Sequence, residues 1–169
     1  MDYRGAISTE EKIVSQREHY FLDICSRFMN PGGDCYGDWI TNLPEVIYKT
    51  GLKQQVQVKF KDEYCGCILL DAPDAKEEYL YIDVKKEDKD KIKIFCPFQT
   101  KDGSYYQVKG CTSTIIITAT GNSTKDVVEK LKKYSKLVNA SSLNKESVDE
   151  LDKIYDIIRH GTHVGVDVF

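Results

Sequence analysis

The stretch from Ser113 to Ala119 reads STIIITA, with three consecutive isoleucines flanked by threonines. β-Branched residues favour extended backbone, and a short apolar run without polar alternation indicates a strand that is buried on both faces. Gly121 follows soon after the run and marks its end. We therefore expect residues 113–119 to form the central strand of a sheet that helices cover.

The N-terminal region has a pattern that favours a helix. Ser8 and Glu11 have the spacing of a capping box, in which each side chain bonds the backbone of the other residue. Apolar residues then recur at helical spacing. They are Ile13, Tyr20, Ile24 and Phe28. We expect a helix over residues 9–29, which the Pro and Gly residues that follow would end.

A polar, Gly-rich loop is expected over residues 30–38, and the only tryptophan, Trp39, follows it. Pro44 is tolerated in the first turn of a helix and Gly51 suits its end, so a short helix is expected between them. Residues 55–61 then alternate between polar and apolar side chains, which predicts a strand.

Further strands are predicted at the spacing of hairpins. They cover residues 65–70, 79–84, 91–96 and 105–108, in addition to the isoleucine strand. Lys101-Asp102-Gly103 is typical of a hairpin turn in which glycine takes the left-handed position.

The chain after the isoleucine strand returns to helical spacing. Ser123 and Asp126 form a second capping box, which opens a helix that we expect to reach Val138. A second run with three-and-four spacing ends at Gly161, a suitable C-cap, and the two helices predict an antiparallel hairpin.

Strands that are followed by helices indicate an α+β fold, because parallel α/β folds alternate the two. We expect a mostly antiparallel sheet of about six strands, with one N-terminal helix and a C-terminal helical hairpin packed on it. The 169 residues favour a single domain over residues 1–169, with tails at 1–7 and 161–169.

Composition limits the classes of partner. The net charge of −3 lacks the basic excess of nucleic-acid-binding proteins, so we do not expect a nucleic-acid partner. No secretory signal and no apolar run long enough to span a membrane is visible, which favours a cytoplasmic protein. Peripheral contact with an acidic surface remains an alternative. It would use a basic face made of Lys130, Lys132, Lys133 and Lys136.

The six cysteines are expected to be reduced thiols that pack as small apolar groups. Cys65 and Cys67 would point to the same face of their strand, and a metal site is the alternative interpretation. Structural zinc sites normally use C-x(2–4)-C pairs, and this spacing is absent, so we expect no metal and no cofactor.

One histidine motif suggests enzymatic chemistry. His160-Gly161-Thr162 has the H-x-T pattern of two-histidine phosphoesterases, but no second H-x-T completes the pair. A histidine near a helix C-terminus also has a structural explanation, because it stabilises the helix dipole. A small enzyme or ligand-binding domain that uses His160 or His163 with a cysteine is therefore the alternative to a non-enzymatic protein.

Two contact elements favour protein binding. Trp39 lies beside Tyr36 in a Gly-rich stretch, and the C-terminal tail alternates apolar residues as an edge-seeking strand does. The tail residues are Val164, Val166, Val168 and Phe169. We expect a non-enzymatic protein-interaction or self-assembly module, and a viral matrix-type or accessory structural protein is an alternative form of it.

Overall fold

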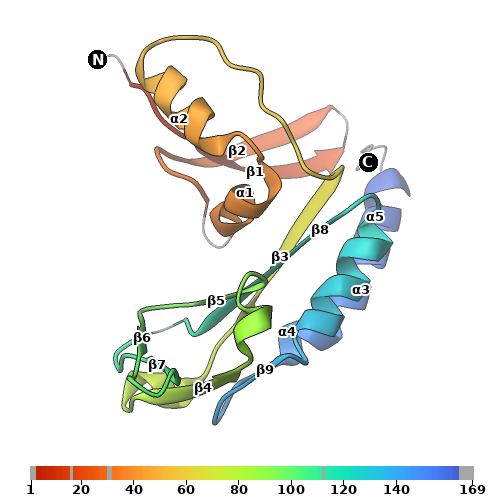
Figure 1. The fold of residues 1–169 in the computed structure, drawn as a ribbon. Coiled ribbons are helices and arrows are strands. Elements are labelled where there is room, and N and C mark those ends of the chain that lie inside the picture. Colours follow the sequence, from red (N-terminus) through yellow and green to blue (C-terminus); the bar gives the residue numbers. More distant parts are fainter. Residues whose placement is uncertain (1–2, 16, 30–31, 112, 164–169) are drawn as a thin grey trace.

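The computed structural model describes residues 3–15, 17–29, 32–111 and 113–163 (Figure 1). At its centre, β8 (Ile115–Gly121) lies between β3 (Tyr64–Leu70) and β5 (Ile92–Ile94), and both pairings are antiparallel. All three isoleucine side chains, Ile115 to Ile117, are fully buried. The central strand predicted from the isoleucine run is confirmed, shifted by two residues toward the C-terminus.

Helices cover both faces of this sheet, as the apolar run indicates. Helix α3 (Thr124–Tyr134) packs on the face that carries Ile115 and Ile117, and it contributes Val127 and Leu131 to the same core. Helix α1 (Gly33–Trp39) lies against β8 and β3 on the opposite face, where Thr118 Oγ1 donates a hydrogen bond to Asp38 at 2.5 Å.

Gly66 sets how closely α3 approaches the sheet. It pairs with Ala119 across β3 and β8, so two small residues lie beneath the helix. A Cβ at Gly66 would lie 2.8 Å from Val127 Cγ1 and 3.5 Å from Leu131 Cδ1. An added methyl group must therefore push the helix away or displace both side chains.

We expect Gly66→Ala to lower the free energy of unfolding by about 1–3 kcal/mol, the usual cost of overpacking a core. Urea denaturation measures the change. Gly37→Ala is the matched control, because no heavy atom lies within 4 Å of its added Cβ. Equal effects of the two variants would contradict this account of the packing.

Four further strands form a second sheet, so the prediction of one six-stranded sheet is wrong. Its order is β6 (Pro97–Gln99), β7 (Tyr105–Gln107), β4 (Leu80–Val84) and β9 (Val138–Asn139), all antiparallel. The predicted strand 91–96 breaks at Cys96, whose positive φ of 44° redirects the chain from β5 into β6. Gly103 has a φ of 91°, as expected for the hairpin turn between β6 and β7.

The C-terminal helices differ in part from the predicted hairpin. Ser123 Oγ accepts a hydrogen bond from the Asp126 amide at 3.1 Å, which confirms Ser123 as the N-cap of α3 and one of the two hydrogen bonds of the predicted capping box. However, α3 ends at Tyr134, and Val138 belongs to β9, where it pairs with Val84. The chain then forms α4 (Glu146–Asp149), a 3-10 turn and α5 (Lys153–His163), which continues through Gly161.

The N-terminal helix predicted over residues 9–29 is wrong. This region forms a hairpin of β1 (Ser8–Ser15) and β2 (Glu18–Cys25), and Ser8 and Glu11 do not cap a helix. A bulge shifts the strand register between Glu10 and Glu11 and leaves an extra residue in β2. A bulged strand places residues three apart on one face, which gives an apolar spacing that resembles a helix.

Two further predictions in this region are corrected and one is confirmed. Residues 33–39 form α1 where a loop was expected, and residues 55–59 are not a strand. Only Phe60 forms a β-bridge, with Ile40. The short helix is confirmed as α2 (Leu43–Gly51), with Pro44 in its first turn.

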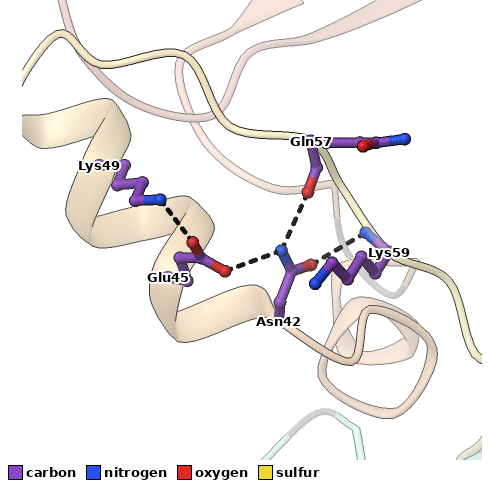
Figure 2. A network of polar contacts seen from close by, with 5 residues as sticks. All are labelled: Asn42, Glu45, Lys49, Gln57 and Lys59. Atoms are coloured by element: carbon purple, nitrogen blue, oxygen red, sulfur yellow. Dashed lines mark hydrogen bonds and ion pairs between the residues drawn. The ribbon is translucent and has the colours of Figure 1, made fainter.

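Asn42 explains why residues 57–59 are extended without a strand partner (Figure 2). Its amide donates to the Gln57 carbonyl oxygen at 2.9 Å, and its carbonyl accepts from the Lys59 amide at 2.9 Å. This side chain thus bonds the backbone of both residues, and the Lys59 carbonyl also accepts from the Thr41 amide at 2.8 Å. Glu45 accepts hydrogen bonds from Lys49 and Asn42, and these bonds lower the pKa of Glu45. Protonation of Glu45 at low pH therefore weakens this network.

Asn42→Ala is expected to lower the free energy of unfolding by about 1–2 kcal/mol, because two backbone groups lose their partner. Trp39 fluorescence during urea denaturation measures the loss, since its ring lies 4.5 Å from that of Phe60 in the same segment. The control is Gln57→Ala, because only the backbone of Gln57 bonds Asn42. A variant as stable as the wild type would show that Asn42 does not hold the segment.

Within the described part of the chain, no helix has the length and apolar character needed to cross a membrane.

Candidate interaction surface

The N-terminal unit, residues 3–62, has almost no core of its own. The buried apolar residues of the described chain begin at Ile68, except for Cys35 of α1. In contrast, most of the large apolar side chains that are strongly exposed lie between Tyr3 and Phe60. An exposed apolar concentration of this kind marks an interaction site in a folded protein.

The bulge gives the β1–β2 hairpin an apolar face and a polar face. Side chains alternate along β1, and residues paired across the hairpin point to the same side. The shifted register brings Phe21 and Ile24 to the side of Ile13. We call these three residues the apolar hairpin face. The polar face carries Glu10, Lys12, Tyr20 and Asp23.

Nothing in the described chain covers the apolar hairpin face. Its residues Ile13, Phe21 and Ile24 are 47%, 60% and 57% exposed. β1 and β2 pair only with each other among the described strands, so both outer edges also remain unpaired. Because an isolated two-stranded hairpin is marginally stable in water, this element needs a covering surface.

The hairpin is anchored to the rest of the N-terminal unit at its base. Tyr3 Oη donates to the Ser26 carbonyl at 2.9 Å, and Arg4 Nη1 donates to the Gly51 carbonyl at 3.0 Å. The rings of Phe28 and Tyr36 lie 5.3 Å apart and link the end of the hairpin region to α1. The hairpin is thus held at one end while its apolar face remains open.

The structure describes the first of the two predicted contact elements, the one that contains Tyr36 and Trp39. Trp39 ends α1, donates from Nε1 to the Asp62 carbonyl at 2.6 Å and packs on Phe60, while Tyr36 contacts Phe28. Both rings make packing contacts within the N-terminal unit and remain half-buried, so their predicted interaction role stays a prediction. The tail residues Val164, Val166, Val168 and Phe169 lie outside the described residues.

The predicted basic face on α3 is partly engaged in ion pairs. Lys130 Nζ lies 2.8 Å from Asp126 Oδ2, and Lys132 Nζ lies 2.6 Å from Asp152 Oδ2. His160 and His163, the residues of the enzymatic alternative, are exposed near the end of α5. A cavity of about 220 Å³ between β3 and α3 is lined by Cys65 and Cys67, and no histidine contributes to its lining.

A polar seam joins the N-terminal unit to the central sheet. Lys93 of β5 donates to the Asp34 carbonyl at 2.5 Å and pairs with Asp38 at 2.7 Å. Thr120 of β8 donates to the Asp62 carboxylate. A charged cavity of about 550 Å³ adjoins this seam. Its lining includes Asp38, Asp62, Asp90, Lys61, Lys91 and Lys130.

The second sheet carries an exposed aromatic cluster. The Phe98 and Tyr106 rings stack at 5.4 Å, and Tyr81 and Tyr79 extend the cluster through further ring contacts. The cluster is held together by these ring contacts, while Tyr79 and Tyr81 remain 58% and 49% exposed.

No protein-family model and no curated protein matches the chain. Among solved structures, the fold is similar to that of phosphoribosylamine–glycine ligase from Thermotoga maritima, with a TM-score of 0.60 and 16% identity over 76% of this chain and 33% of that chain. Urea carboxylase from Kluyveromyces lactis gives a TM-score of 0.45 and 12% identity over 90% of this chain and 14% of that chain. The chain spans about a third of the length of the ligase, and the likeness concerns the fold alone.

Proposed function

We propose that this chain is a non-enzymatic protein-interaction module that self-associates through the apolar hairpin face. The observation that carries the proposal is the contrast between a central sheet with a continuous core and an N-terminal unit whose large apolar side chains lie in water. The free energy gained by burying such side chains is available to a partner that covers the hairpin.

The charged residues beside the apolar hairpin face allow it to bind a second copy of the chain. In a twofold interface each residue meets a different residue of the copy, so a surface that carries both signs can complement itself. Glu11 shares the side of the apolar hairpin face, and Arg17 lies at the hairpin turn. An antiparallel arrangement of two hairpins sets the acid of one copy toward the base of the other.

The surface area also suits a second copy. The apolar hairpin face and its exposed neighbours provide several large side chains near half exposure. They are Ile7, Val14, Leu22, Phe28 and Met29. At on the order of 100 Å² for each side chain, an interface that covered all eight would bury roughly 800 Å² per copy, the area that each partner of a specific complex typically buries.

Sedimentation velocity between about 1 and 100 µM, the range that weak to moderate dimers span, tests the proposal. The buffer contains a reducing agent, so that disulfides between chains cannot produce the result. We expect the sedimentation coefficient to rise with concentration from that of one chain to that of two. A single-chain coefficient over the whole range would overturn self-association.

A further inference from the structure

One face of the second sheet carries a row of aromatic rings. Alternate residues of β4 are buried, whereas Tyr81 and Asp83 are exposed on the other face. Tyr81 pairs with Tyr106 of β7, and Tyr106 pairs with Phe98 of β6, so the three rings lie side by side across three strands. Figure 1 shows this sheet at the end of the molecule away from the β1–β2 hairpin. The aromatic row is therefore separate from the apolar hairpin face.

A groove of about 560 Å³ opens beside the aromatic row, between β4 and the residues of β9 and its continuation. Strand β9 pairs with β4 only at Asp83 and Val84, so the two chains no longer pair beside Tyr81. The rings of Tyr79 and Tyr81 line the groove, together with Glu78 and Asp83. The groove thus combines two aromatic side chains with two carboxylates.

The groove favours a positively charged ligand. No lysine or arginine lines it, and neither Glu78 nor Asp83 forms an ion pair within the part of the chain that the structure describes. Lys145 donates to the Asn139 side chain at 3.3 Å, but its other two hydrogen bonds go to backbone carbonyls. The faces of the tyrosine rings also attract cations. Rings and carboxylates therefore favour the same kind of guest.

We propose that this groove binds an arginine side chain from an arginine-rich segment of a partner protein. The guanidinium group is planar, so it can stack on a tyrosine ring and form a bidentate pair with a carboxylate. A lysine ammonium is compact and strongly hydrated, and it has no planar surface to stack. Exposed aromatic rings can also stack nucleic-acid bases, but Glu78 and Asp83 repel the phosphates of such a strand.

The aromatic row favours a peptide segment over free arginine. Neighbouring strands lie ~4.8 Å apart, so a row across three strands spans roughly 10 Å, the length of about three extended residues. Tyr81 lines the groove and also begins the row, with a ring centroid 5.4 Å from that of Tyr106. The residues beside the bound arginine can therefore lie over Tyr106 and Phe98, whose rings stack at 5.4 Å.

Fluorescence anisotropy of the full chain with a labelled peptide of alternating arginine and glycine tests the proposal. Two further peptides replace arginine by lysine or by citrulline, which keeps the planar shape and loses the charge. We expect binding of the lysine peptide to be at least ~3-fold weaker and that of the citrulline peptide at least ~10-fold weaker. Equal affinity for the arginine and citrulline peptides would overturn the proposal, and so would equal affinity for the arginine and lysine peptides.

Tyr81→Ala is expected to weaken binding of the arginine peptide by about 5- to 30-fold, the loss of one cation–π contact. Tyr48→Ala is the matched control, because Tyr48 lies on α2 and is 69% exposed. Tyr48→Ala should leave the affinity unchanged. Equal weakening by both variants would show that the aromatic row is not the binding surface.

The carboxylates are tested by a change that leaves the aromatic rings intact. Glu78→Gln is expected to weaken binding by about 3- to 10-fold, because a charged partner of the guanidinium becomes neutral. Glu77→Gln is the matched control, since Glu77 adjoins Glu78 and does not line the groove. Its affinity should stay within about twofold of the wild type, because salt screens charges outside the contact.

The comparison of the three peptides uses the wild-type chain, so it decides the question even if Tyr81→Ala disturbs the sheet. A labelled oligouridylate is added as a fourth probe. Tighter binding of this strand than of the arginine peptide would overturn the proposal and assign the aromatic row to nucleic acid.

Discussion

Replacing Phe21 and Ile24 together by aspartate is expected to abolish self-association, with a dissociation constant at least ~100-fold weaker. Each aspartate places a charge at the centre of a surface that the second copy must desolvate, and central apolar anchors typically contribute about 2 kcal/mol or more. Sedimentation velocity measures the change. Both side chains are more than half exposed in the single chain, so the variant should keep its fold.

Tyr20→Asp is the matched control for this experiment. Tyr20 adjoins Phe21 in the sequence and is also half exposed, but the register places it on the polar face opposite Lys12. We expect its dissociation constant to stay within about threefold of the wild type, as for a residue outside the interface. If Tyr20→Asp and the double variant weaken association equally, the face assigned to the interface is wrong.

Ile117→Ala is expected to lower the free energy of unfolding by about 2–5 kcal/mol, since the lost side chain leaves a cavity in a closely packed core. Ile117 is fully buried between β3, β5 and α3. Thermal or urea unfolding measures the loss. A change of this size is a large fraction of the stability of a typical domain.

Ile157→Ala makes the same chemical change at an exposed site. Ile157 lies on α5 and is 65% exposed, so we expect a change within about 0.5 kcal/mol. A small effect at Ile117, comparable with that at Ile157, would contradict the central position of the isoleucine strand.

The sequence predicted the central sheet well because its signals are local. Three consecutive β-branched residues need burial on both faces, and Ser123 with Asp126 defines the start of α3 by direct side-chain to backbone bonding. The hairpin turn at Gly103 was predictable for the same reason, since glycine accepts a positive φ.

The N-terminal unit was mispredicted because its structure depends on the strand register and on contacts between residues far apart in the sequence. The bulge in β2 brings Phe21 and Ile24, three residues apart, to one face, so the apolar spacing matches a helix as well as a strand. Residues 55–59 alternate like a strand, but the Asn42 side chain bonds their backbone at Gln57 and Lys59. Asn42 lies more than ten residues before this segment, so the local sequence gives no sign of its contacts.

The candidate surface was only partly visible in the sequence. Protein binding was expected from Trp39 and from the C-terminal tail; Trp39 makes contacts within the N-terminal unit, and the tail lies outside the described residues. Two residues of the apolar hairpin face, Ile13 and Ile24, belong to the apolar stripe of the predicted helix, so their exposure became apparent only with the fold. Strand alternation alone places Cys65 and Cys67 on one side of β3, and their pairing with Thr120 and Thr118 agrees with that prediction.

Hydrogen exchange of the backbone amides of residues 18–25, measured at low and high protein concentration, tests the central claim most directly. The account predicts that protection of this strand increases with concentration, because the second copy stabilises a hairpin that is otherwise marginal. The amides of residues 115–121 serve as the internal reference and should not change. Protection of residues 18–25 that is independent of concentration would contradict the account.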